Sequence, residues 1–291
     1  MYICVCVKQT PDSASVYVDP ITGDVDYERF VQVLNPADAC AVEASVRLRD
    51  QVGGTIMVLT LGPKDAEGAL RAALAIGANS ALRLWDSKAE AWGPFTVAAA
   101  LAGYLRSETP SPDLVLCGDR SSDWSSGIVG PALAEQLDLP QVTSVMQLKL
   151  LEEHETVTLQ LTRKLERGYR ELLEAELPLL ITVTSDLNEP RYPSLPAHLA
   201  ALKAEIPVLD PQAQMSDSWL HGTDEMTLLE IHAPRPLPRH IPAPDSQHSA
   251  YQRIGEIVAG GATGRKTQLV EGSSEELAKV LVDFLKNRGF V

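Results

Sequence analysis

The chain has few aromatic residues and no long apolar run. Aromatic residues make up 5% of its 291 residues and hydrophobic residues 45%, so the core is largely aliphatic and disorder throughout is excluded. No apolar run approaches the roughly 18 residues that a membrane helix needs, so no membrane insertion is expected. The apolar start, Tyr2–Val7, has no cationic leader or small-residue cleavage site. It is predicted to be a strand and not a signal peptide.

Basic clusters are also lacking. There are 25 basic and 39 acidic residues, which give a net charge of −14. The longest basic clusters, Arg163-Lys164 and Arg265-Lys266, contain only two residues each. Nucleic acid and anionic membrane surfaces are therefore unfavourable partners.

Cysteine and histidine form no recognisable catalytic or metal-binding pattern. Cys4, Cys6, Cys40 and Cys117 include no C-x-x-C pair and no histidine at ligand spacing. Buried thiols in a reducing, cytoplasmic compartment are expected. The histidines lie outside the alternating core, so the sequence predicts neither a metal site nor a catalytic residue of its own.

Short apolar runs alternate with helical patterns from Tyr2 to about Leu139, as a mainly parallel, doubly wound sheet requires. A hairpin is expected at Val16–Val25, and Asn35 is expected to cap the first helix. The predicted strands are Ile3–Val7, Ile56–Leu61, Ala81–Trp85 and Leu114–Cys117. The other predicted helices follow Gly62-Pro63 and span about Phe95–Leu105.

After Pro140 the pattern changes, because extended runs follow one another without helices. These runs, predicted to be antiparallel additions to the sheet, are Val142–Leu151, Thr156–Leu161 and Leu179–Thr184. Prolines then accumulate from His198 to about Tyr251, which predicts an extended arm. The capping box Ser273–Glu276 predicts a closing amphipathic helix that ends at Gly289. We expect an α/β domain at 1–197 and an arm with its helix at 198–291.

Ligands of open parallel sheets bind beyond the carboxyl ends of the strands. The loop Gly118–Pro131 follows a buried strand and leads into a helix that begins near Gly130. Its main-chain N–H groups and the hydroxyls of Ser125 and Ser126 suit a phosphate, although an ordinary turn explains the loop composition equally well. Asp123 is a candidate for a ribose hydroxyl or for a cap of the loop.

Three segments together resemble the beta subunit of electron transfer flavoprotein, over about residues 1 to 200. The first is Val7-Lys8 with Leu34–Asp38 and Ala41–Ala44. The second is Gly118–Pro131, which is similar to the nucleotide loop of that family. The third is Leu187–Pro196. The fold that this resemblance implies is Rossmann-like, of the adenine nucleotide alpha-hydrolase-like kind.

The resemblance implies a heterodimer whose larger alpha subunit holds the redox-active FAD. This chain would bind its own nucleotide, either AMP or a second FAD. The family commonly carries Thr-Gly-Gln where this chain has Ser126-Gly-Ile128, so the choice between AMP and FAD stays open. The cofactor-binding residues implied by position are Val7, Lys8, Asn35, Asp38, Gly62, Gly118, Asp123, Ser125, Ser126, Gly127, Ile128 and Gly130.

In the family, the third segment begins a recognition loop, here 185–197, with an exposed leucine that matches Leu195. Prolines stiffen this loop and so reduce the entropy lost on docking. The docking residues implied are Asn188, Glu189, Pro190, Arg191, Tyr192, Leu195 and Pro196. The implied partners are a flavin-dependent dehydrogenase, such as an acyl-CoA dehydrogenase, and a quinone oxidoreductase or another acceptor.

The predicted function is the small subunit of an electron transfer flavoprotein, an electron carrier without catalytic residues of its own. A stand-alone adenine-nucleotide sensor of the universal stress protein type is the alternative, and an ATP-using enzyme of the same broad fold is a third possibility. Whether the C-terminal arm wraps the alpha subunit or its own domain stays open.

Overall fold

The structure, a computed structural model, describes residues 1–17, 19, 25–26, 29–151, 157–211, 248–258 and 272–287. The chain divides into two compact units, Met1–Pro234 and Arg235–Val291. Most of the hairpin predicted at Val16–Val25 lies outside the described residues.

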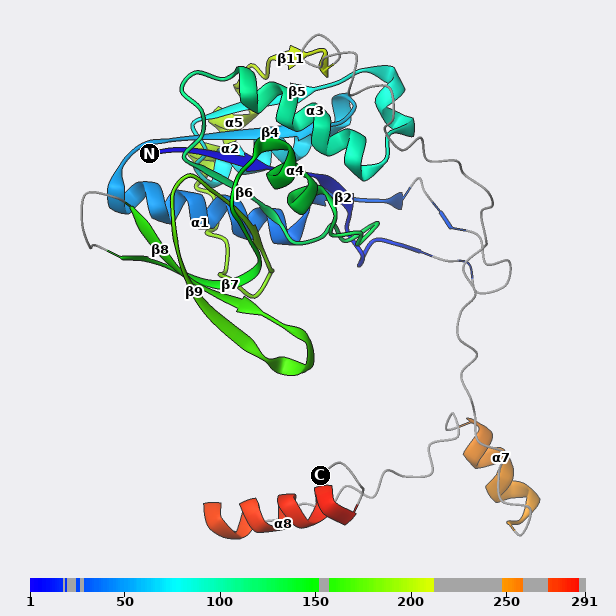
Figure 1. The fold of residues 1–291 in the computed structure, drawn as a ribbon. Coiled ribbons are helices and arrows are strands. Elements are labelled where there is room, and N and C mark those ends of the chain that lie inside the picture. The colour runs from blue at the N-terminus through cyan, green and yellow to red at the C-terminus, as the bar shows by residue number, and fades with distance from the viewer. Residues whose placement is uncertain are drawn as a thin grey trace. The chain divides into compact units, whose positions relative to one another are not determined.

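A nine-stranded sheet forms the centre of the first unit (Figure 1). Its strands, in spatial order, are β11 (Val208–Leu209), β5 (Ser80–Leu84), β4 (Thr55–Leu61), β1 (Tyr2–Cys6), β6 (Leu114–Gly118), β10 (Leu179–Val183), β7 (Gln141–Leu151), β8 (Thr158–Lys164) and β9 (Arg170–Glu176). Neighbouring strands from β11 to β7 are parallel, and β8 and β9 are antiparallel additions. The predicted fold class, a mainly parallel Rossmann-like sheet with added antiparallel strands, is confirmed. A separate antiparallel pair joins β2 (Gln9–Pro11) to β3 (Gln32–Leu34).

The prediction that Leu179–Thr184 is antiparallel was wrong. β10 is parallel to both of its neighbours, β6 and β7. The run from Arg170 to Val183 keeps its direction through Leu177-Pro178, pairing first with β8 as β9 and then with β6 and β7 as β10. A strand that continues without reversing needs no crossover helix, so the lack of a helix did not indicate an antiparallel strand.

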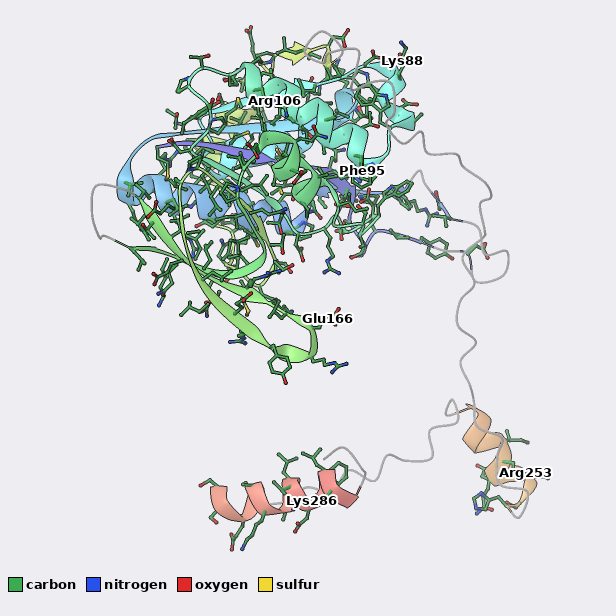
Figure 2. All side chains as sticks on the ribbon, in the orientation of Figure 1. Lys88, Phe95, Arg106, Glu166, Arg253 and Lys286 are labelled. Atoms are coloured by element: carbon green, nitrogen blue, oxygen red, sulfur yellow. The ribbon has the colours of Figure 1, made fainter. Side chains whose placement is uncertain are left out.

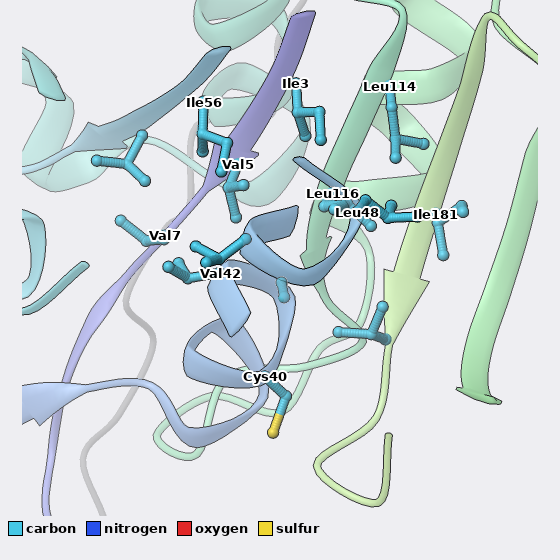
Figure 3. Close-up of a cluster of buried hydrophobic side chains, with 14 of the residues drawn as sticks. Ile3, Val5, Val7, Cys40, Val42, Leu48, Ile56, Leu114, Leu116 and Ile181 are labelled. Atoms are coloured by element: carbon cyan, nitrogen blue, oxygen red, sulfur yellow. The ribbon is translucent and has the colours of Figure 1, made fainter. Parts of the chain in front are cut away.

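Helices cover both faces of the sheet (Figure 1). α1 (Pro36–Val52) and α2 (Glu67–Ile76) pack on one face, and α3 (Pro94–Ser107) and α4 (Val129–Leu137) pack on the other. In α1, Pro36 occupies the first turn, where its missing N–H costs nothing, and Gly53 ends the helix at a positive φ of 74°. Figure 3 shows the core side chains of α1, among them Val42 and Leu48, beside β1 and β6. Short 3₁₀ turns, η2 (Lys64–Ala66) and η3 (Ser87–Ala91), follow β4 and β5.

The extended arm predicted from residue 198 does not begin there. α5 (Leu195–Lys203) is a helix across the predicted boundary at 197, and β11 pairs with β5 at the sheet edge. Arg71 of α2 donates to the carbonyl oxygens of Ala201, Leu202 and Ala204 and so satisfies the last turn of α5. The proline-rich stretch 233–244 lies outside the described residues.

The described part of the second unit consists of two helices, α7 (Ala250–Val258) and α8 (Ser274–Asn287). The predicted capping box at the start of α8 is confirmed. The Ser273 N–H donates to Glu276 Oε2 at 2.9 Å, and the Glu276 N–H donates to Ser273 Oγ at 3.4 Å. α8 exposes much of its apolar side, including Leu281 and Phe284.

Candidate functional site

The carboxyl ends of β1, β4 and β6 meet at one edge of the sheet, where α1 begins. Val7, directly after β1, donates its N–H to the Leu59 carbonyl at 2.8 Å and accepts from Thr60 Oγ1 at 2.6 Å. Gly62 lies at the same edge after β4. Its N–H donates to the Leu84 carbonyl at 3.1 Å, and its carbonyl accepts from Arg83 at 3.2 Å. The main-chain groups of Val7 and Gly62 are thus engaged in the sheet edge itself.

Asp38 joins the ends of β1 and β6 from the first turn of α1. Its Oδ2 accepts the Lys8 N–H at 2.7 Å, and its Oδ1 accepts the Gly118 N–H at 2.8 Å. Burial raises the pKa of Asp38 to about 6, although both main-chain hydrogen bonds favour its ionised form. A Cβ at position 118 would lie 2.3 Å from Asp38 Oδ1, so this close approach requires glycine.

Asn35 stands at the N-cap position of α1, but its side chain makes no capping hydrogen bond. The prediction of a capping role was therefore wrong. Its Nδ2 donates to the Arg120 carbonyl at 3.1 Å, and its Oδ1 accepts the Ser122 N–H at 3.1 Å. Asn35 is buried and holds the loop after β6, because that loop supplies a donor and an acceptor opposite its amide.

Lys8 and Asp123 form an ion pair of 2.6 Å between the end of β1 and the loop after β6. Partial burial would raise the pKa of Asp123, but the hydrogen bond from Lys8 prevails and holds that pKa below its ordinary value. Asp123 Oδ1 also accepts the Trp124 N–H at 2.8 Å. The structure thus brings two predicted site residues into direct contact.

The loop then enters α4 through a left-handed turn. Ser125 has a φ of 52° and Gly127 a φ of 65°, and Ser126, Gly127 and Ile128 immediately precede the helix. The first N–H groups of a helix have no intrahelical acceptor and favour an anion. A Cβ at position 130 would lie 2.5 Å from Thr182 Cγ2, so the buried Gly130 lets the start of α4 pack closely on β10.

A cavity of about 770 Å³ opens on the other side of this loop. One wall is the loop with the start of α1, and the opposite wall includes the ends of β7, β8 and β10 with η4 (Glu166–Gly168), which joins β8 to β9. Figure 2 labels Glu166 at the tip of this hairpin. Its lining residues are Asn35, Pro36, Ala37, Asp119, Arg120, Ser121, Ser122, Ser125, Ser144, Lys164, Leu165, Glu166, Thr184, Ser185 and Asp186.

Sequence reasoning found only Asn35 and Ser125 among these lining residues. Ser144 lies in β7, where the register with β10 shifts, has a φ of 56° and donates its N–H to Thr182 Oγ1 at 2.9 Å. Lys164 and Asp186 form an ion pair of 3.0 Å across two segments. Neither feature has a local sequence signal, because each depends on the pairing of distant strands.

The predicted docking segment is fixed on one side and exposed on the other. The Asn188 amide donates to the Cys40 carbonyl at 3.0 Å, and Arg191 forms an ion pair with Glu43 at 2.8 Å. Beyond it, Tyr192 is 99% exposed and Leu195 is 69% exposed. Glu189 and Pro196 are also at the surface, and Pro190 is half-buried.

No helix in the described ranges is both long enough and apolar enough to cross a membrane. Over the same residues, no cluster of three or more His, Cys, Asp or Glu side chains is arranged to hold a metal ion.

Comparison with known proteins identifies the family. The model of the electron transfer flavoprotein domain matches residues 25–214. The chain is 35% identical to the electron transfer flavoprotein subunit beta of Thermoanaerobacterium thermosaccharolyticum over 275 residues, which cover 93% of this chain and 97% of that protein. It is 32% identical to Protein FixA of Azotobacter vinelandii over 262 residues, 88% of this chain and 92% of that protein.

A third relative is the caffeyl-CoA reductase-Etf complex subunit CarD of Acetobacterium woodii, 36% identical over 209 residues, which cover 72% of this chain and 78% of that protein. The chain therefore belongs to the electron transfer flavoprotein family, in the group of beta subunits and FixA proteins.

Proposed function

We propose that this chain is the nucleotide-holding and partner-docking subunit of a heterodimeric electron transfer flavoprotein. Its partner would be a larger alpha subunit that carries the redox-active FAD. The chain itself would hold AMP or a second FAD by its adenine nucleotide part. The FAD of the complex, when bound, accepts and releases electrons, and no side chain of this subunit takes part in that chemistry.

One observation carries the proposal: the loop after β6 is held in place from both sides at the ligand-binding edge of the sheet. Asn35 binds its main chain at Arg120 and Ser122, and Lys8 binds Asp123. Preorganised main-chain donors lose little entropy when a phosphate binds, so affinity for a nucleotide is gained without movement of the loop.

The residues fit an adenine nucleotide in charge and in shape. Gly118 and Gly130 remove side chains where the backbone must approach closely, and the N-terminus of α4 favours a phosphate. Lys8 supplies a cation at the same edge, with about half of its side chain exposed. Ser125 and Ser126 add hydroxyl groups. The universal stress protein alternative has no comparable support, because the family match is to electron transfer flavoproteins.

Docking of a flavin-dependent dehydrogenase, such as an acyl-CoA dehydrogenase, is assigned to the exposed segment around Leu195. A fully exposed tyrosine and a largely exposed leucine beside a fixed main chain are typical of interface anchors. The acceptor would be a quinone oxidoreductase or another redox protein. We place the complex in the cytoplasm, because all four cysteines are free and buried.

Co-expression with the flavoprotein subunit encoded beside it tests the proposal. We expect a yellow one-to-one complex whose flavin absorption is bleached by an acyl-CoA and an acyl-CoA dehydrogenase. A colourless chain that elutes alone from size-exclusion chromatography would contradict the assignment.

A further inference from the structure

Glu43 is a buried carboxylate on α1 that binds two arginines. Its Oε1 accepts from Arg47 Nε at 2.6 Å and from Arg191 Nη2 at 3.2 Å. Its Oε2 accepts from Arg191 Nε at 2.8 Å and from the Arg191 main-chain N–H at 3.2 Å. The Glu43 side chain is 2% exposed. Burial would raise the pKa of Glu43, but the hydrogen bonds from both arginines hold that pKa below its ordinary value.

The same side of α1 holds the main chain of the segment that follows β10. The Cys40 carbonyl accepts from the Asn188 amide at 3.0 Å, and Cys40 Sγ lies 3.3 Å from the Asn188 carbonyl (Figure 3). Arg47 Nη2 donates to the Glu189 carbonyl at 3.1 Å. Residues 40, 43 and 47 share one side of a helix, so α1 presents a row of partners to residues 188–191.

Immediately after these contacts the chain exposes its apolar side chains. Tyr192 is fully exposed, and Leu195, Leu199 and Leu202 lie at positions i, i+4 and i+7 of α5, all exposed. The place of this apolar row relative to the sheet is therefore set on its N-terminal side by the contacts of Arg191.

We propose that Glu43 is the positioning residue of the docking surface: it fixes Arg191 and thereby the direction in which Tyr192 and Leu195 project toward a partner protein. This inference rests on the proposed docking function. If the segment left α1, the buried carboxylate of Glu43 would lose three of its four hydrogen bonds. An uncompensated buried charge is strongly unfavourable, so the attached state is the stable one.

The chemistry of the pair explains why a carboxylate and an arginine are used. The planar guanidinium offers donors in a fixed geometry that matches two carboxylate oxygens, which a lysine does not. An amide at position 43 keeps the shape of the side chain but turns an NH₂ group toward Arg47 or Arg191. Donor would then face donor, and the segment would be held less firmly.

Hydrogen–deuterium exchange of the two-subunit complex tests the inference with the variant Glu43→Gln. We expect amides of residues 188–196 to exchange about tenfold faster, the factor given by losing the net free energy of one hydrogen bond. Exchange of residues 114–130 and the content of bound nucleotide are expected to stay unchanged. Arg191→Lys, which keeps the charge and loses the two-pronged geometry, provides a second variant should Glu43→Gln fail to fold.

Glu171→Gln is the matched control, since Glu171 also faces an arginine, Arg163 at 3.6 Å, but lies on β9 away from the docking segment. With an acyl-CoA dehydrogenase as electron donor, Glu43→Gln should raise the KM for the complex about tenfold and leave kcat unchanged. Unfolding alone would lower the active fraction and not change KM.

Wild-type exchange of residues 188–196 in both Glu43→Gln and Arg191→Lys would overturn the inference. So would faster exchange with an unchanged KM, provided that Leu195→Ala raises KM. An unchanged KM for Leu195→Ala would contradict the docking role itself, so the failure of the proposed function is distinguishable from the failure of the role of Glu43.

Discussion

The substitution Asp38→Asn tests how the edge of the sheet is held together. The Asp38 carboxylate is 5% exposed and accepts the N–H groups of Lys8 and Gly118, one on each oxygen. Burial raises its pKa from the ordinary 3.8 to about 6. Between these two values the native state binds more protons than the unfolded state, so the contribution of Asp38 to stability falls as the pH rises.

The magnitude follows from the pKa difference. The difference between 3.8 and about 6 corresponds to about 3 kcal/mol, at 1.36 kcal/mol per pKa unit. About 2 kcal/mol of this lies between pH 4.5 and pH 7. Asparagine does not titrate, so Asp38→Asn should gain about 2 kcal/mol relative to the wild type when the pH is raised from 4.5 to 7.

Urea unfolding of both proteins at pH 4.5, 5.5, 6.5 and 7 measures this difference, and the exposed Asp65→Asn serves as the control, since its difference from the wild type should not change in this way. The opposite trend, with the wild type gaining on the variant as the pH rises, would refute the reasoning. It would show that the two main-chain hydrogen bonds outweigh burial and hold the pKa below 3.8.

Three further predictions concern the loop and the docking segment. Gly130→Ala places a Cβ 2.5 Å from Thr182 Cγ2 and should lower the free energy of unfolding by about 1 to 3 kcal/mol; an unchanged melting temperature would contradict the close packing of α4. Lys8→Met removes a half-exposed ion pair with Asp123, so stability should change by less than about 1 kcal/mol. Nucleotide affinity, measured by calorimetry, should nevertheless fall, and unchanged affinity would remove Lys8 from the site. Leu195→Ala should slow flavin reduction by the dehydrogenase in stopped-flow experiments while the bound nucleotide is retained, and a normal rate would end its docking role.

Much of the parallel sheet could be predicted because its signals are local. β1, β4, β5 and β6 are short apolar runs, each buried along most of its length, and each is separated from the next by helical spacing. The order of such strands places their carboxyl ends, and therefore the loop after β6, at one edge.

The rest depends on contacts between distant residues. Asn35 has the residue type of a helix cap, but the partners that occupy its side chain lie 85 and 87 positions away. The direction of β10 depends on β9 continuing past Pro178, and the cavity wall depends on the shifted register at Ser144. Local propensity does not carry this information, so sequence reasoning located one side of the site and missed the other.

Identification of the bound nucleotide tests the central claim most directly. The complex is purified without added nucleotide, denatured with acid, and the released small molecules are identified by mass and quantified against protein. We expect one adenine nucleotide per copy of this chain in addition to the FAD of the larger subunit, either AMP or a second FAD. A complex that releases only one FAD, or a chain that holds and hydrolyses ATP, would contradict the account.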